Sequence, residues 1–285
     1  MEKAARNCIL CNNSDRSLLI KKGNWTVYKC NHCGLGVLDP RPDEKEFSDL
    51  YDSIYFDSHY DNGLKIGSDV MQRRLSQQGH RIRFFRKYKK KGRILDIGCG
   101  QGYFLLACRT FGYEVEGIDI SDYSASYVRK ELKIPVTAGP IRDINFQSNS
   151  YDVITMWHFL EHASNPKFYL DKARRWLKDD GVLIVDVPNY EGFDAQSDLT
   201  NWPNWDLPYH VYHFTAESLV AILQQHGFKI IRTKNYLSEH VKDKLDRIPV
   251  INLLARPIAR FFSGHSFAVV AKKDKNFSPK ASDNL

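Results

Sequence analysis

Long apolar runs are absent from this sequence of 285 residues. No stretch approaches the roughly 18 consecutive apolar residues that a membrane-spanning helix requires. The first residues, 1–8, also lack the apolar core and small-residue cleavage site of a secretory signal. Hydrophobic residues make up 42% of the chain and charged residues 26%, which is typical of a globular protein with a full core. We therefore expect a cytoplasmic protein without a transmembrane segment.

Cysteine is scarce, but four of the six cysteines form a regular pattern. Cys8 and Cys11 make one C-x-x-C motif, and Cys30 and Cys33 make a second one after 18 intervening residues. This spacing predicts a zinc ribbon, in which four thiolates leave no open coordination position, so the zinc would be structural. A disulfide framework and a redox motif are the alternatives, and reduced cytoplasmic thiols argue against the first.

The sequence between and after these motifs suggests how the chain is divided. β-Branched and aromatic residues flank a Gly-Asn turn within residues 17–29, which predicts a short hairpin. We expect a zinc ribbon over residues 1–40, a linker with a short helix over 41–68, a main domain over 69–275 and a flexible tail over 276–285.

The net charge of +7 makes an anionic partner possible, whether nucleic acid, nucleotide-linked substrate or membrane surface. Much of the excess lies in residues 81–93, where cations alternate with aromatics, as in some nucleic-acid-binding proteins. The favoured alternative is an amphipathic helix with Ile82, Phe85 and Tyr88 facing inward.

From Arg93 onward, strand patterns alternate with helix patterns, which indicates a parallel α/β sheet with crossover helices. Thr215 has the position of an N-cap, and Ser218 stands where a capping box would have Glu or Gln. Seven strands are predicted: Arg93–Ile97, Val115–Asp119, Val136–Ala138, Tyr151–Met156, Val182–Val187, Phe228–Tyr236 and Ser266–Lys272. Helices are predicted over Tyr103–Phe111, Tyr123–Leu132 and Phe168–Leu177, and after Thr215.

A glycine-rich turn joins the first of these strands to the next helix. Asp96 ends the strand, and Gly98, Gly100 and Gly102 allow a sharp turn and close approach of the backbone to a ligand. The following helix presents unpaired N–H groups at its start. Asp119 closes the second strand, where a carboxylate can accept both hydroxyls of a ribose. Together these features indicate a nucleoside-bearing cofactor.

With these motifs the sequence resembles the class I S-adenosylmethionine-dependent methyltransferases, and more narrowly a bacterial group with an N-terminal four-cysteine zinc ribbon. The resemblance implies a Rossmann-like, doubly wound sheet of seven strands. It is carried by residues 95–102 (Leu-Asp-Ile-Gly-Cys-Gly-Gln-Gly), 117–119, 150–162, 177–185 and 207–215.

The resemblance also implies which residues hold the methyl donor. The glycine turn would lie along the methionine part, Asp119 would bind the ribose, and the segment near Pro140 would border the adenine. Relatives often place an acid where this chain has Pro140, so Asp143 or a backbone carbonyl would have to replace it. The implied donor-binding residues are Asp96, Gly98, Cys99, Gly100, Gly102, Tyr103, Phe104, Asp119, Ile120, Pro140, Ile141, Trp157 and His158.

Methyl transfer from a sulfonium needs alignment and exclusion of water, and it needs a base only if the acceptor loses a proton. Neutral histidines near the carboxyl ends of the strands suit that role. We rank His210 first, followed by His158 and His213, and interpret His162 as a local hydrogen-bonding residue. If helical, His210 and His213 would share one face.

Residues 189–212 combine aromatic rings with carboxylates, which would suit a sugar, although such a loop could equally cover the core. We therefore predict methyl transfer to a small-molecule acceptor, first a sugar or nucleotide-linked sugar. The alternatives are RNA base methylation, quinone or lipid methylation, and a cofactor-binding protein without turnover. The apolar and basic segment 237–262 could contact a membrane surface, the body of the protein or another subunit.

Overall fold

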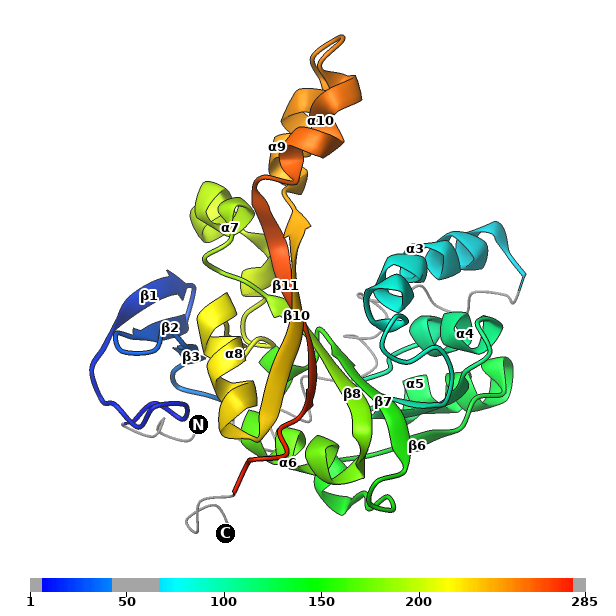
Figure 1. Cartoon of the computed structure of the whole chain (residues 1–285). Coiled ribbons are helices and arrows are strands. Elements are labelled where there is room, and N and C mark those ends of the chain that lie inside the picture. Colours follow the sequence, from blue (N-terminus) through cyan, green and yellow to red (C-terminus); the bar gives the residue numbers. More distant parts are fainter. Residues whose placement is uncertain (1–6, 43–66, 279–285) are drawn as a thin grey trace.

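The computed structural model describes residues 7–42 and 67–278 (Figure 1). Most of the predicted linker, including its short helix, and most of the predicted tail lie outside the described residues. The main body is a seven-stranded sheet with the order β10-β11-β8-β7-β4-β5-β6. Its strands are β4 (Arg93–Ile97), β5 (Glu114–Asp119), β6 (Val136–Ala138), β7 (Tyr151–Trp157), β8 (Leu177–Pro188), β10 (Phe228–Leu237) and β11 (Ser263–Lys273).

The sheet confirms the predicted seven strands, but it is mixed. The five strands from β4 to β8 run parallel, whereas β11 pairs antiparallel with both β8 and β10. The last two strands are adjacent in sequence and in space, so they form a long hairpin and need no crossover helix between parallel neighbours. The expected parallel sheet with crossover helices is therefore found from β4 to β8, and the antiparallel pairing of β11 is an addition at this edge.

Helices cover both faces of the sheet, which confirms the doubly wound fold (Figure 1). Two buried clusters fill the two layers, one under α3, α4 and α5, and one under α6 and α8. The helices are α3 (Asp69–Phe85), α4 (Tyr103–Thr110), α5 (Asp122–Tyr127) with a π-helical continuation (Val128–Leu132), α6 (Pro166–Trp176), α7 (Phe193–Asp198), α8 (Ala216–Gln225), α9 (Glu239–Asp246) and α10 (Asn252–Ala259).

Two local predictions about these helices are confirmed. Ile82 and Phe85 are fully buried on the inner face of α3, so the basic segment begins as an amphipathic helix. At the start of α8, Thr215 and Ser218 cap each other reciprocally, with Ser218 acting where Glu or Gln is usual.

The ribbon forms a separate four-stranded sheet, β1-β2-β3-β9. Its first two strands, β1 (Arg16–Lys22) and β2 (Trp25–Cys30), make the predicted hairpin, and β3 (Gly36–Leu38) follows the second C-x-x-C motif. The fourth strand, β9 (Tyr212–His213), comes from the segment that precedes α8. The ribbon is therefore joined to the main body by backbone pairing.

Residues 189–212, predicted as a long loop, fold over the ribbon and contain α7. Trp202 and Trp205 are buried together with Tyr190 in a third core cluster that also holds ribbon residues Ile20 and Val27. These rings are core, so they cannot form a sugar-binding wall. The sequence could not reveal this, because the partner side chains lie more than a hundred residues away.

The hairpin β10–β11 carries α9 and α10 on an arm that projects from the body (Figure 1). Its apolar residues Val250, Leu253 and Phe261 are 81%, 81% and 89% exposed. No helix in the described part of the chain is long and apolar enough to cross a membrane.

The tight pairing of β3 with β9 gives a first prediction. A Cβ atom on Gly36 would lie 2.9 Å from Cβ of His213 and 3.2 Å from Cδ2 of Leu19. We expect Gly36→Ala to lower the free energy of unfolding by about 1–3 kcal/mol, because a packed interface has no room for a methyl group. Chemical denaturation would measure the loss.

Gly79→Ala is the matched control. Gly79 lies inside α3, and its nearest neighbour is the flexible end of Arg83 at 3.3 Å. There the same substitution should stabilise the protein by up to about 1 kcal/mol through helix propensity. If Gly36→Ala were as stable as the unchanged protein, the close packing of β3 on β9 would be disproved.

Candidate active site and metal centre

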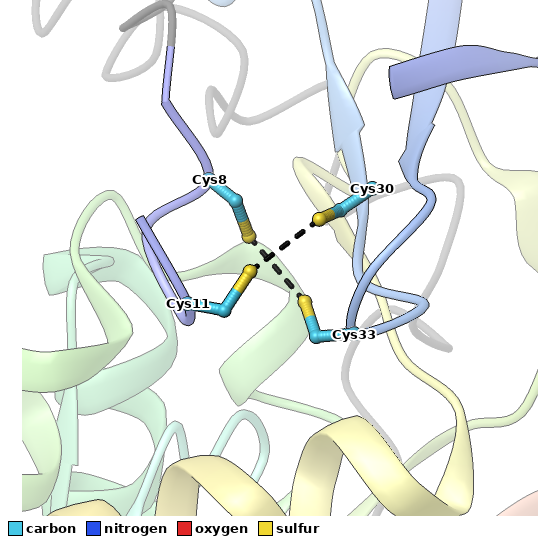
Figure 2. A group of neighbouring side chains, drawn as sticks. All are labelled: Cys8, Cys11, Cys30 and Cys33. Atoms are coloured by element: carbon cyan, nitrogen blue, oxygen red, sulfur yellow. Dashed lines mark hydrogen bonds between the residues drawn. The ribbon is translucent and has the colours of Figure 1, made fainter. Parts of the chain in front are cut away.

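The four ribbon cysteines meet around one point (Figure 2). The Sγ atoms of Cys8 and Cys33 are 3.5 Å apart, as are those of Cys11 and Cys30. All four sulfurs lie within 4.8 Å of one another. Since a disulfide bond is about 2.05 Å long, the predicted alternative of a disulfide framework does not fit these separations. Thiolates bound to one tetrahedral zinc lie about 3.8 Å apart, so this donor set does fit the ion.

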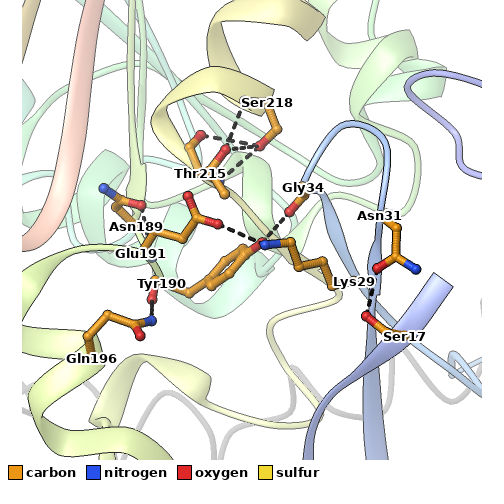
Figure 3. A network of polar contacts seen from close by, with 10 residues as sticks. All are labelled: Ser17, Lys29, Asn31, Gly34, Asn189, Tyr190, Glu191, Gln196, Thr215 and Ser218. Carbon is orange, nitrogen blue, oxygen red and sulfur yellow. Dashed lines mark hydrogen bonds and ion pairs between the residues drawn. The ribbon is translucent and has the colours of Figure 1, made fainter.

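A polar network fixes the ribbon against the main body (Figure 3). The hydroxyl of Tyr190 donates to the carbonyl of Gly34, directly after the last cysteine, and Lys29 Nζ lies 3.0 Å from Glu191 Oε1. A Cβ atom on Gly34 would approach Thr215 Cγ2 to 3.3 Å. The second C-x-x-C turn therefore rests on the N-terminus of α8.

A pocket of about 760 Å³ opens at the carboxyl ends of β4 and β7. The glycine turn after β4 lines it, as predicted, and two of its glycines are sterically required. A Cβ atom on Gly98 would lie 2.4 Å from Phe159, and one on Gly102 would lie 2.9 Å from Val128. Nine of the predicted donor-binding residues line this pocket: Asp96, Gly98, Cys99, Gly100, Gly102, Tyr103, Phe104, Trp157 and His158. Gln101 of the same turn, which was not predicted, lines it too.

Two buried carboxylates support the glycine turn. Asp96 accepts a hydrogen bond of 2.5 Å from the hydroxyl of Thr155, and burial raises its pKa to about 7. Asp119 accepts the backbone N–H of Gly100 at 2.7 Å and that of Ser121 at 3.0 Å, while burial raises its pKa. Each carboxylate oxygen has a second lone pair, so both groups keep capacity for a ligand.

The other predicted donor-binding residues lie beside the pocket. Asp119, Ile120, Pro140 and Ile141 are not among its lining residues. Ile120 is 44% exposed just after β5, Pro140 is exposed after β6, and Ile141 is buried. Their contact with an adenine remains a prediction.

Sequence reasoning did not place basic side chains in this pocket. Arg74, Arg81 and Arg83 of α3 line it together with Arg256 of α10, and the guanidinium of Arg81 lies 4.8 Å from the centre of the Trp157 ring. The basic residues of α3 were the signal in the sequence that could have indicated a basic pocket. Which of them face a pocket depends on how α3 packs, and a sequence pattern does not contain that information.

Among the three predicted catalytic histidines, His158 is the one that lines this pocket. It follows β7 with a φ of +50°, and its side chain is 38% exposed. Its Nδ1 lies 3.3 Å from Oε1 of Glu161 and its Nε2 3.5 Å from Oγ of Ser266. Enclosure by itself lowers the pKa of His158, but the nearby carboxylates of Asp186 and Glu161 raise it above the usual value.

The other two predicted catalytic histidines, His210 and His213, lie close to each other and to His162. His210 and His213 are only 6% and 4% exposed, and their rings are 6.2 Å apart. They lie on an extended segment and in β9, so the conditional expectation of a shared helical face does not apply. The ring of His162 lies 4.5 Å from that of His210.

Burial lowers the pKa of each of these three imidazoles, to about 3 for His162 and His213. They therefore stand as neutral rings beside the fully buried Glu161. For Glu161, burial raises the pKa but the surrounding imidazoles lower it, and the net value is below normal.

Comparison with known proteins agrees with this arrangement. The model of the family described as a methyltransferase domain matches residues 70–233. A solved S-adenosylmethionine-dependent methyltransferase from Archaeoglobus fulgidus superposes with a TM-score of 0.54 and 25% identity, covering 70% of this chain and 94% of that one. Coclaurine N-methyltransferase superposes with a TM-score of 0.51 at 15% identity, covering 73% of each chain, a likeness of fold alone.

Two relatives found by sequence align with only part of this chain and with about half of their own length or less. A probable S-adenosylmethionine-dependent methyltransferase of Mycolicibacterium smegmatis is 24% identical over 48% of this chain, which spans about half (52%) of that protein. A ubiquinone biosynthesis O-methyltransferase of Bordetella avium is 30% identical over 34% of this chain and 43% of its own length.

The chain belongs to this methyltransferase-domain family, because the family model covers more than half of it. The enzyme class predicted from the glycine turn, an S-adenosylmethionine-dependent methyltransferase, is thereby confirmed.

Proposed function

We propose that the enzyme transfers a methyl group from S-adenosylmethionine to a small anionic acceptor, with a nucleotide-linked sugar as first choice. The observation that carries this proposal is that the glycine turn and four arginines line one and the same pocket. The glycine turn with Asp96 would hold the donor, and the arginines from α3 and α10 would form the acceptor wall. Guanidinium groups bind phosphate in a bidentate geometry, which favours a phosphate-bearing acceptor over a neutral sugar.

In this proposal the glycine turn binds the methyl donor and the arginines bind the acceptor. The turn and Asp96 hold the methionine part of the donor, and Asp119 keeps the turn in place through Gly100 and binds the ribose. The arginines orient the acceptor for in-line attack on the methyl group. His158, which also lines the pocket, takes the proton that an oxygen or nitrogen acceptor releases. This ranks it above His210 and His213, which are buried.

RNA base methylation is the main alternative, since the same arginines could hold a phosphate backbone. It predicts retention of RNA that weakens steeply with salt. The volume of the pocket falls within the range of small-molecule sites, about 300–1,000 Å³, and therefore favours the small acceptor.

The acceptor wall can be tested with Arg256→Ala. Loss of a charge-assisted contact should raise KM for a nucleotide-linked sugar about tenfold or more, while the Kd for S-adenosylmethionine changes little. Mass spectrometry of methylated product across a panel of nucleotide-linked sugars would supply the assay. Arg260→Ala is the matched control, because it removes the same charge from the same arm at a residue outside the pocket lining. Equal KM values for the two variants would contradict the proposed acceptor wall.

The proposed roles of His158 and Asp119 predict different effects of their substitution on kcat and on donor binding. His158→Ala should lower kcat about 10²–10⁴-fold, because proton removal slows, and should leave donor binding intact. Asp119→Ala should abolish donor binding as measured by calorimetry. If His158→Ala kept full kcat on an acceptor that must lose a proton, another group would be the base.

We further propose that the cysteine cluster holds a structural zinc and that the chain is of the ribbon-bearing bacterial group. The fit of the four sulfurs to a tetrahedral ion supports this. The double variant Cys30→Ser/Cys33→Ser should contain about one zinc per chain less than Cys108→Ser, whose cysteine is buried in α4 away from the cluster. Elemental analysis after chelator-free purification measures the difference, and equal zinc contents would disprove the ribbon site.

A further inference from the structure

Close to His158, one partly buried and three buried side chains form a group that the proposed methyl transfer does not use. Glu161 and His162 belong to the short 3-10 helix η3 (Leu160–His162), and His210 and His213 come from the segment that ends in β9. The potential ligand atoms of Glu161, His162 and His210 all lie within 4.8 Å of one another. We propose that these three residues bind a divalent metal ion, separate from the zinc of the cysteine cluster.

The strongest argument is the state of the Glu161 carboxylate. It is 1% exposed, and neither oxygen has a hydrogen-bond partner among residues 7–42 and 67–278. His158 Nδ1 approaches Oε1 to 3.3 Å without hydrogen-bond geometry. Buried carboxylates are normally paired or coordinate a metal. A protonated His158 could balance part of the charge of Glu161, and a metal ion would supply the ligand bonds that both oxygens lack. Nε2 of His213, also buried, likewise has no hydrogen-bond partner in the described part of the chain.

The two imidazoles are oriented as metal ligands are. Nδ1 of His210 lies 2.8 Å from the carbonyl of Asn204, and Nδ1 of His162 lies 3.2 Å from the carbonyl of Tyr209. A carbonyl can only accept, so Nδ1 carries the proton in both rings and Nε2 carries the lone pair. Metal-bound histidines characteristically donate their other N–H to such a carbonyl, which fixes both tautomer and ring orientation.

The donor set indicates the class of ion. Two imidazoles and one carboxylate suit a zinc, manganese, iron or cobalt ion, and they leave coordination positions open. Asp206 Oδ2 lies 3.7 Å from Nε2 of His210 and adds a second negative charge beside the site. Two ligand atoms of one ion lie at most roughly 4 Å apart, slightly less than the 4.8 Å within which these ligand atoms lie. Small side-chain rotations would bring all three within reach of one ion.

A metal there would connect two segments that shape the pocket. Glu161 and His162 follow His158, the proposed base, in the chain, and His210 precedes β9. The N–H of Val211 already donates to the carbonyl of Glu161 at 2.9 Å. The ion would hold His158 in position through Glu161. Metal binding itself is independent of the proposed methyl transfer, and only this effect on His158 rests on it.

Cobalt titration tests the site without donor or acceptor, so failure of the proposed methyl transfer would leave the result standing. Protein with its cysteine cluster occupied by zinc should bind about one Co²⁺ per chain and show d–d bands without thiolate-to-cobalt charge transfer. The melting temperature should rise with added Co²⁺, since the ion binds the folded state.

Glu161→Gln and His210→Gln should each weaken Co²⁺ binding by more than about a hundredfold, because loss of even an outer-shell partner costs about 10–100-fold. His226→Gln is the matched control, because His226 is equally buried but is paired with Asp171 at 2.7 Å, outside this cluster. Circular dichroism shows which variants fold.

Three results would overturn the proposal. The unchanged protein could bind no Co²⁺, it could bind Co²⁺ only with thiolate charge transfer, or folded Glu161→Gln could bind Co²⁺ as tightly as His226→Gln. The first of these needs no variant, so a failure of Glu161→Gln to fold leaves the proposal open to disproof.

Discussion

The backbone pairing of β3 with β9 is the constraint on which the arrangement of this molecule depends. Leu38 N–H donates to the carbonyl of Val211 at 2.9 Å, and the N–H of Val211 donates to the carbonyl of Glu161 at the same distance. One short path of backbone hydrogen bonds therefore connects the cysteine-bearing sheet to the turn after β7. Since His158 belongs to that turn, the position of this pocket-lining residue depends on residues near the N-terminus.

The glycine turn after β4 is built differently, from local sequence. The glycine turn lies between two consecutive elements, and close neighbours Phe159 and Val128 exclude side chains from it. Its carboxylates are buried, so their raised pKa values reflect the cost of placing charge in a site that awaits a ligand. A site of this kind is self-contained, and it lies within the residues 70–233 that the family model matches.

This difference also explains what the sequence could predict. Strand β4, the glycine turn and the capping box each follow from a few neighbouring residues, and all three are confirmed. The burial of Trp202, the pairing of β9 and the position of Arg81 depend on contacts between segments far apart in the chain. Local patterns are compatible with several such contacts, so the aromatic segment looked as suited to a sugar as to a core. The cysteine cluster is the exception, because its spacing encodes the long-range contact directly.

The arm of α9 and α10 has a consequence for how this enzyme can diversify. It grows from the end of a hairpin whose strands pair from Phe228 with Lys273 to Leu237 with Ser263, so its length and sequence can change without shifting the register of the sheet. Arg256 reaches the pocket from this arm, whereas the glycine turn does not depend on it. If Arg256 contacts the acceptor as proposed, evolution could exchange one arm for another and alter the choice of acceptor without changing the glycine turn.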